Sequence, residues 1–563
     1  MKGNPFIYYL DQYNVLSPNH SKIYDEYTYD VNNEENYTFN VPTKIEETLV
    51  SLFENAPQSV ILTGNAGDGK TRLCRIIYNY FNDDDLTTWP EKGIVDFSFN
   101  NGKTLRIVKD LSELKEEVIH RELAELQKNI QDNHSSNIYY LIAANEGKLT
   151  KFLSQREELN YLREEVKKRF DSYKYNSNEL SIFNLLDVTS SVYVDRVLKE
   201  WNQKENWSSC HSCPMQDRCI IYMNHDRTSQ PQIQEKIVEQ YQLLDYLDTH
   251  ITMREMLIHI SFMLTGGYTC DDVLDADYKE LKEQIKHSYY QNFYGHDISE
   301  NAFSEMKALR LFKTLDPGIY SHSSIDDFIV NGDINGDEKL EQTHSQIFGK
   351  TLDLELGYFK KKLTLYRDYN VNNDHSLIEE WIPKLRRKLF YELHDEVGFN
   401  TDQLLPFEYI DRYKSLFDNR KNQKAIKKDL TNGFNRVFSG RLTKDKKELL
   451  ATNKNLMIYE SFSKKAVDLL EEIGRNDLDR EPSKFTFKVE DEVSVNLNLA
   501  IFEYLMRASG GGTHNILQQD AEILVDTFKN ELIRLSEPDD YELNILRYDR
   551  EEGLFIEDEI SLD

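Results

Sequence analysis

A glycine-rich octapeptide carries the clearest chemistry in this chain. It satisfies the pattern G-x-x-x-x-G-K-[ST] and consists of Gly64, Asn65, Ala66, Gly67, Asp68, Gly69, Lys70 and Thr71. Glycines let backbone N–H groups turn toward an anion without Cβ clashes, and a following helix adds its positive end. In this pattern Lys70 pairs with the β- and γ-phosphates, and the hydroxyl of Thr71 binds Mg²⁺. The octapeptide therefore predicts a site for ATP and Mg²⁺.

A second acidic residue on the magnesium side has two candidates, because no apolar run ends in Asp-Glu. Glu146 follows the run 138–144 and is placed to polarise the attacking water, with Asn145 where an aspartate is usual. Asp110 follows the run 104–108 and has a competing role as a helix N-cap. Counting strands favours Glu146, because a hairpin at 93–108 leaves too little chain for a parallel crossover. If 138–144 is instead the γ-phosphate-sensing strand, Asn145 is the sensor and Asp110 holds the metal.

Further polar residues are candidates for the same site. Asn184 and Asp187 close the apolar run 180–186, and helix capping is an equal explanation for Asp187. Arg254 begins a predicted helix and is a candidate arginine finger, in cis or in trans. Gly510 to Gly512 lack a preceding apolar strand, so we interpret them as a turn between helices rather than a second phosphate site.

Three of the five cysteines have the spacing of metal ligands. Cys210, Cys213 and Cys219 lie within ten residues, which predicts a structural Zn²⁺ site or, alternatively, buried free thiols. His225, His211 and Cys270 are candidates for a fourth ligand. His225 is preferred because it is close in sequence without the strain of adjacent ligands. A catalytic zinc is not indicated, since no carboxylate-rich histidine motif accompanies the cysteines.

Strands and helices must alternate around the octapeptide to position these groups. The run 59–63 predicts a strand directly before it, and Leu73, Ile76 and Ile77 predict a helix directly after it. Asn101-Gly102 predicts a hairpin of 93–99 with 104–108. Further strands are expected at 138–144 and 180–186, and further helices at 44–54, 112–131 and 150–172. We expect an α/β P-loop NTPase core of three layers with a mostly parallel sheet, a helical lid and a largely helical C-terminal region.

A length of 563 residues exceeds one ordinary domain. We expect an N-terminal leader, the core, a segment with the cysteines and the helical lid, and a mostly helical C-terminal domain that ends in a β-hairpin. Their predicted ranges are 1–42, 43–205, 206–320 and 321–563, and the polar stretch 321–342 marks the last boundary.

Composition narrows the class of protein. The chain has 39% hydrophobic and 12% aromatic residues, as folded proteins do, and a net charge of −30, which disfavours wholesale coating of nucleic acid. No signal-peptide pattern and no apolar run of eighteen residues occurs, so we expect a cytoplasmic protein without a membrane span. No paired-carboxylate nuclease motif is found.

Four segments together resemble the DptF family, ATPase subunits of DNA phosphorothioation-dependent (Dnd/Dpt) restriction systems. The segments are GNAGDGKT at 64–71, AANEG at 143–147, WSSCHSCPMQDRC at 207–219 followed by Asn224, and ITMRE at 251–255. One departure is Ile220-Ile221, where Pro-Ile is expected. The resemblance implies a bacterial antiviral defence role, in which ATP-driven work with partners resembling DptG and DptH restricts DNA that lacks the phosphorothioate mark. DNA contact would be made through the complex, and the sequence is compatible with an oligomer.

Two other functions fit the same residues. Nucleotide binding alone, with little turnover, would make the chain a regulatory switch for partner assembly, and the atypical Asn145 supports this interpretation. A small-molecule kinase is disfavoured, because the predicted helical C-terminal half exceeds what a substrate lid needs.

Overall fold

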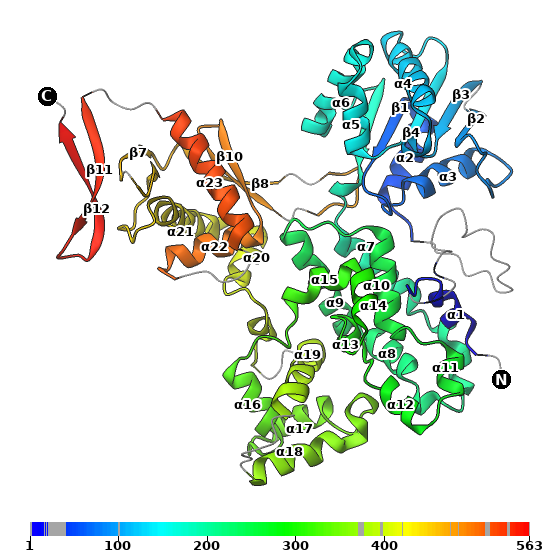
Figure 1. Ribbon diagram of the computed structural model, residues 1–563, viewed down its shortest axis with the longest axis vertical. Coiled ribbons are helices and arrows are strands. Elements are labelled where there is room, and N and C mark those ends of the chain that lie inside the picture. The colour runs from blue at the N-terminus through cyan, green and yellow to red at the C-terminus, as the bar shows by residue number, and fades with distance from the viewer. Residues whose placement is uncertain are drawn as a thin grey trace.

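The computed structural model describes most of the chain. The described residues are 3–15, 17, 20, 41–99, 102–369, 377–393, 398–418, 420–455, 457–472, 475–481, 484–512, 518–536 and 541–561. An α/β unit, a helical region and a C-terminal region with smaller sheets follow one another along the chain (Figure 1). None of the helices described is long and apolar enough to span a membrane.

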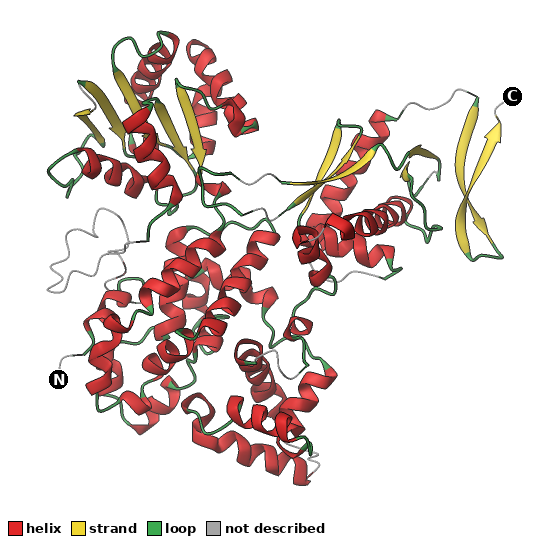
Figure 2. Ribbon diagram, turned by 180° about the vertical axis from the view of Figure 1, so that it is seen from behind, coloured by secondary structure: helices red, strands yellow, loops and turns green. Residues whose placement is uncertain are grey.

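A five-stranded, mostly parallel sheet forms the centre of the α/β unit (Figure 2). Its order is β2-β3-β4-β1-β5, with β1 Ser59–Thr63, β2 Ile94–Phe99, β3 Lys103–Val108, β4 Ile138–Ala143 and β5 Leu180–Asn184. β1 pairs in parallel with β4 and β5, β3 pairs in parallel with β4, and β2 runs antiparallel to β3. The predicted α/β sheet and the predicted hairpin at 93–108 are therefore confirmed.

Helices cover both faces of this sheet. The side chains of β1 alternate, so Val60 and Leu62 enter one hydrophobic core and Ile61 enters the other. The first core contains α2 (Lys44–Asn55) and α3 (Lys70–Phe81), and the second contains α4 (Glu116–Gln131), α5 (Glu146–Ser154) and α6 (Asn160–Asp171). The single helix predicted at 150–172 was wrong, because the chain breaks between α5 and α6.

The helical region follows β5, the last strand of the sheet, in the sequence. It contains α7 Ser190–Trp201, α8 Ile220–Thr228, α9 Pro231–Tyr246, α10 Met253–Thr265, α11 Cys270–Leu274, α12 Tyr278–Gln284, α13 Tyr289–Asn292, α14 Glu300–Glu305 and α15 Lys307–Phe312. The N-terminal α1 (Pro5–Asp11) packs against α10, where the Ser261 hydroxyl donates to the carbonyl of Leu10 at 2.9 Å. The leader thus contributes a helix to this region.

Helices dominate the C-terminal region, but small sheets accompany them. The helices are α16 Ser323–Asn331, α17 Glu338–Ile347, α18 Tyr358–Tyr369, α19 Ile382–Glu392, α20 Ile410–Asp418, α21 Arg420–Ser439, α22 Leu499–Ser509 and α23 Gln518–Leu535. The strands are β6 Leu449–Thr452, β7 Tyr459–Phe462, β8 Val467–Glu471, β9 Phe485–Val489, β10 Val493–Leu497, and the hairpin of β11 Glu542–Asp549 with β12 Leu554–Ser561. Within the polar stretch 321–342, predicted as a domain boundary, α16 buries Ile325 and Phe328.

Candidate functional site

The glycine loop, residues 64–69, joins the buried strand β1 to the first turn of α3. Gly64, Gly67 and Gly69 have φ values of +144°, +100° and +87°, which residues with a Cβ rarely adopt. A Cβ at Gly64 would lie 2.7 Å from Oδ2 of Asp68. Gly69 is the N-cap of α3, so the N–H groups of the first helical turn begin at the loop.

Lys70 turns its ammonium back into the glycine loop. Its Nζ donates to the carbonyl of Gly64 at 2.9 Å and to that of Asn65 at 2.7 Å, and the residue is only 8% exposed. Burial lowers the pKa of Lys70, while the negative charges of Asp68 and Asp110 act to raise it. The positive charge of Arg254 lowers it further. The ammonium of Lys70 therefore lies near Asp110, a candidate magnesium ligand, and Arg254, the candidate arginine finger.

Asp68 ties the loop to itself and to the helical region. Its Oδ2 accepts from the N–H of Asn65 at 2.5 Å, and its Oδ1 accepts from Nε2 of His250 at 2.8 Å. The Asp68 side chain is 3% exposed. Sequence reasoning missed His250, because no local pattern relates it to a loop 182 residues away.

The N-terminus of α10 rests directly on the glycine loop. Thr252 and Glu255 form a capping box there, and the N–H of Arg254 donates to the carbonyl of Gly67 at 3.2 Å. A Cβ at Gly67 would lie 3.1 Å from Cβ of Arg254, so the close approach requires a glycine. The structure thus brings Arg254 to the loop in cis.

The carboxyl ends of the strands bring the remaining predicted residues to one edge of the sheet. Leu62 of β1 is aligned with Ala143 of β4, and Thr63 with Asn184 of β5. Val108 of β3 is aligned with Ile142 of β4. Parallel strands end at the same edge, so the residues that follow them gather beside the glycine loop. These residues are Asp110, Asn145, Glu146 and Asn184.

Asp110 and Glu146 differ in their surroundings. The negative charge of Asp110 acts on the ammonium of Lys70. Oδ1 of Asp110 also accepts from the N–H of Ser112 at 2.7 Å, so Asp110 caps the short helical turn that follows it, as the alternative interpretation predicts. Glu146 accepts from Nδ2 of Asn184 at 3.4 Å. The side chain of Asn145 caps α5 by accepting from the N–H of Lys148 at 3.2 Å.

The strand-counting argument against Asp110 was wrong. β3 does pair in parallel with its successor β4, because residues 109–137, which include α4, supply the crossover after the hairpin. β4 consequently lies between β1 and β3. This order matches the alternative in which Asn145 ends a strand next to the glycine loop and Asp110 ends the strand beyond it.

Asp187 does not join this group. Its carboxylate pairs with Arg475 at 3.3 Å and with Arg480 at 3.0 Å, both from the C-terminal region. Neither partner was suspected from the sequence.

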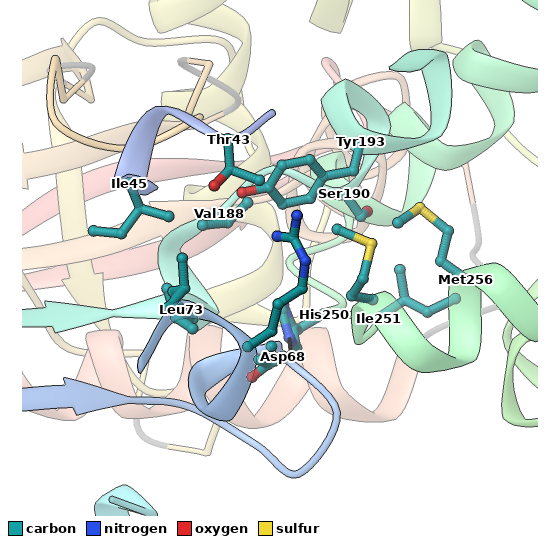
Figure 3. A pocket seen from close by; sticks show the side chains of 14 residues that line it. Thr43, Ile45, Asp68, Leu73, Val188, Ser190, Tyr193, His250, Ile251 and Met256 are labelled. Carbon is teal, nitrogen blue, oxygen red and sulfur yellow. Dashed lines mark hydrogen bonds and ion pairs between the residues drawn. The ribbon is translucent and has the colours of Figure 1, made fainter. Parts of the chain in front are cut away.

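A pocket opens beside the glycine loop (Figure 3). Asp68 and Gly69 of the loop form part of its wall, and most of the rest is apolar. The lining residues are Thr43, Ile45, Asp68, Gly69, Arg72, Leu73, Leu185, Val188, Ser190, Tyr193, His250, Ile251, Met253 and Met256. They come from elements far apart in sequence, so no motif indicated the pocket.

The cysteines predicted to bind zinc gather around the N-terminal helix. Asn4 donates from its backbone N–H to Sγ of Cys270 at 3.2 Å and from Nδ2 to Sγ of Cys210 at 3.3 Å. The thiol of Cys270 also interacts electrostatically with those of Cys213 and Cys219. Among the residues that the structure describes, however, no group of three or more His, Cys, Asp or Glu is arranged to hold a metal ion.

His225, the predicted fourth zinc ligand, has other partners. Its ring stacks on Trp207 with centroids 4.1 Å apart, and its Nδ1 lies 2.9 Å from Oδ1 of Asn202. Burial lowers the pKa of His225 to about 4. His225 thus has a packing partner and a hydrogen-bond partner in this structure, while Cys270 is the candidate whose thiol lies near those of the other cysteines.

Comparison of the chain with protein-family models, curated proteins and solved structures finds no match. The function must therefore be argued from the site itself.

Proposed function

We propose that this chain binds ATP at the glycine loop and hydrolyses it. The observation that carries the proposal is the placement of the octapeptide 64–71 between a buried strand and the first turn of a helix, with the Lys70 ammonium held inside the loop. Loop carbonyls are weak partners for a buried cation. Phosphate oxygens would replace them with stronger, charge-assisted hydrogen bonds.

Thr71 and Asp110 are the residues that would hold Mg²⁺. A hydroxyl and a carboxylate are the hard oxygen donors that this ion prefers, and the charge of Asp110 already acts on Lys70. When bound, the ion would neutralise negative charge that develops on the phosphates. Thr71 lies in the first turn of α3, where the helix also favours anions.

Glu146 and Asn145 complete the hydrolytic assignment. Both follow β4, the strand next to the glycine loop strand. Glu146 would accept the proton of the attacking water, while Asn145 would donate a hydrogen bond to the γ-phosphate. Arg254, which meets the loop through its backbone, would stabilise charge on the transferred group in cis.

The role of this hydrolysis in the cell rests on the sequence resemblance to the DptF family. ATP turnover would drive restriction of DNA without the phosphorothioate mark, together with partners resembling DptG and DptH. Four segments carry that resemblance: the glycine loop, AANEG, the cysteine segment and ITMRE. The last of these contacts the glycine loop.

A nucleotide-gated switch is the second candidate. Two contacts favour it: His250 to Asp68, and the N–H of Arg254 to the carbonyl of Gly67. Phosphate binding that rearranges the loop would disturb both contacts and shift α10. Such coupling requires no turnover.

Replacing Lys70 by alanine tests nucleotide binding. We expect the affinity for Mg²⁺-ATP, measured by titration calorimetry, to fall roughly ten- to a hundredfold, because a charge-assisted hydrogen bond contributes about 1.5–3 kcal/mol. Lys199→Ala is the control, since that side chain is 64% exposed on α7. Unchanged affinity in Lys70→Ala would contradict the proposal.

Two isosteric variants separate an ATPase from a switch. Glu146→Gln should keep ATP affinity and lower steady-state turnover by about 10²–10⁴-fold, the usual contribution of a general base. Asp110→Asn should instead weaken the magnesium dependence of binding. Turnover would be measured with and without DNA and partner proteins. A wild-type protein that binds ATP but shows no turnover under all these conditions is a switch.

A further inference from the structure

The pocket beside the glycine loop is continuous with the proposed phosphate site. Asp68 and Gly69 belong to both, and Leu73 of α3 lies one turn further along the pocket wall (Figure 3). A nucleotide with its phosphates in the loop has to place its base on one side of the loop. The pocket is a mainly apolar recess on one side of the loop, lined by residues that flank Lys70 in the sequence.

Its chemistry suits a flat aromatic group. Ile45, Leu185, Val188, Ile251 and Met256 supply aliphatic and thioether surface, which packs well against aromatic rings.

The hydroxyl groups of the lining are already engaged by the protein. Thr43 donates to Glu46 at 2.9 Å, Ser190 donates to Asp245 at 2.8 Å, and the Tyr193 hydroxyl is hydrogen-bonded to Asp479. The pocket therefore presents mainly apolar surface to an occupant.

A segment of the C-terminal region holds the pocket wall in place. Residues 475–481, between β8 and β9, cross from the small C-terminal sheet to the α/β unit. Asp479 accepts from the N–H of Lys44 at 2.7 Å and from Arg196 at 2.6 Å, and its side chain is only 4% exposed. Its backbone carbonyl accepts from the N–H of Thr189 at 2.9 Å.

These contacts join two walls of the pocket. Lys44 begins α2, beside Thr43 and Ile45, while Tyr193 and Arg196 lie on α7. One buried carboxylate thus fixes the start of α2 relative to α7. Burial and the charge of Asp479 also raise the pKa of Tyr193, so its hydroxyl stays a proton donor to that carboxylate.

We propose that this pocket binds the adenine base of the nucleotide and that Asp479, from the C-terminal region, maintains its shape. The inference rests on the proposed function and adds the base specificity and the element that controls it. Adenine is favoured over guanine because guanine has an additional carbonyl that would lose its hydration. The charged donors in the lining, Arg72 and His250, are already paired with Glu46 at 2.5 Å and with Asp68 at 2.8 Å.

The test compares Mg²⁺-ATP, Mg²⁺-GTP and inorganic tripolyphosphate as ligands of the full chain in titration calorimetry. Wild-type protein should bind ATP at least about tenfold more tightly than GTP and than tripolyphosphate. Val188→Phe, which fills the pocket, should reduce ATP affinity about tenfold or more and leave tripolyphosphate affinity unchanged.

Asp479→Asn should act in the same direction as Val188→Phe, because it weakens the contacts to Lys44 and Arg196. The matched control is Asp477→Asn on the same segment, whose carboxylate pairs with Arg475 instead. Retained tripolyphosphate binding shows that each variant keeps a folded glycine loop.

The two proposals fail in different ways. If wild-type protein binds neither ATP nor tripolyphosphate, the proposed function is wrong. If ATP and tripolyphosphate bind equally well, or if Val188→Phe and Asp479→Asn lower both affinities together, the base pocket is wrong while the phosphate site stands.

Discussion

At the scale of single residues, Lys70 is the side chain on which the proposed phosphate site depends most. Its ammonium is buried, which lowers its pKa, and the charges of Asp68 and Asp110 counteract that effect. Two loop carbonyls hold it at 2.9 and 2.7 Å. Because the amine stays close to the backbone of the loop, little reorganisation is needed when phosphate oxygens replace those carbonyls.

The cysteines lead to a prediction about zinc at the same scale. Burial raises the pKa of Cys219 to about 11 and that of Cys270 to about 12, so without a metal these groups are neutral thiols. Cys210, Cys213, Cys219 and Cys270 would hold zinc as thiolates, so their protons would be released on binding. We expect Cys270→Ser to abolish stoichiometric zinc, measured by mass spectrometry of metals, and His225→Ala to retain it.

The pattern of zinc loss distinguishes the fourth ligand. Zinc that is lost in His225→Ala but kept in Cys270→Ser would show that His225, and not Cys270, is the fourth ligand. Wild-type protein without zinc after metal-replete purification would make the cysteines ordinary core residues.

At the scale of elements, local patterns were predicted well and pairings across the chain were not. β1, the glycine loop and α3 are adjacent in sequence, and the hairpin of β2 with β3 has its own Asn-Gly turn. The parallel pairing of β3 with β4 depends on the packing of α4, which periodicity does not specify. β9 and β10 were missed although FTFKV and VSVNL alternate buried residues with more accessible ones. Alternation over five residues is a weaker signal than the continuous apolar runs of β1 and β5.

The buried contacts of α10 predict how stability depends on pH. His259 is fully buried, with Tyr241 donating to its Nδ1 at 2.6 Å and its Nε2 donating to the carbonyl of Phe293 at 2.8 Å. Burial lowers its pKa from 6.5 to about 4. Below pH 6.5 the unfolded chain takes up a proton that the folded chain does not, so stability falls as the pH drops toward 4.

The expected loss from His259 is roughly 3 kcal/mol between pH 7 and pH 4. Denaturant titrations at pH 7, 6, 5 and 4 would measure it. His259→Leu should be less stable at pH 7 but should show a shallower pH dependence. His120→Leu is the control, because His120 is 41% exposed. An equal pH slope in wild type and His259→Leu would refute the assignment.

At the scale of the whole molecule, the proposed nucleotide site is bordered by residues that lie far apart in the sequence. Asp479 and Lys44 are 435 residues apart, and Lys484 pairs with Asp248 of the helical region at 2.5 Å. Such contacts could not be predicted from spacing, because they arise only when three regions have folded and packed. They give the C-terminal region a direct route to the proposed base pocket.

The charge of the whole chain makes a prediction about DNA. The chain has 68 Lys and Arg against 98 Asp and Glu, a net charge of −30, so bringing it to duplex DNA costs electrostatic free energy at most orientations. We expect the isolated protein to bind a labelled duplex more weakly than about 10⁻⁴ M at physiological salt, the weak end of non-specific binding, as measured by fluorescence anisotropy. With ATP and the proposed partner proteins, binding should become detectable. Duplexes with and without the phosphorothioate mark form the matched pair. Tight binding by this chain alone, with a steep salt dependence, would instead place a basic DNA surface on this subunit.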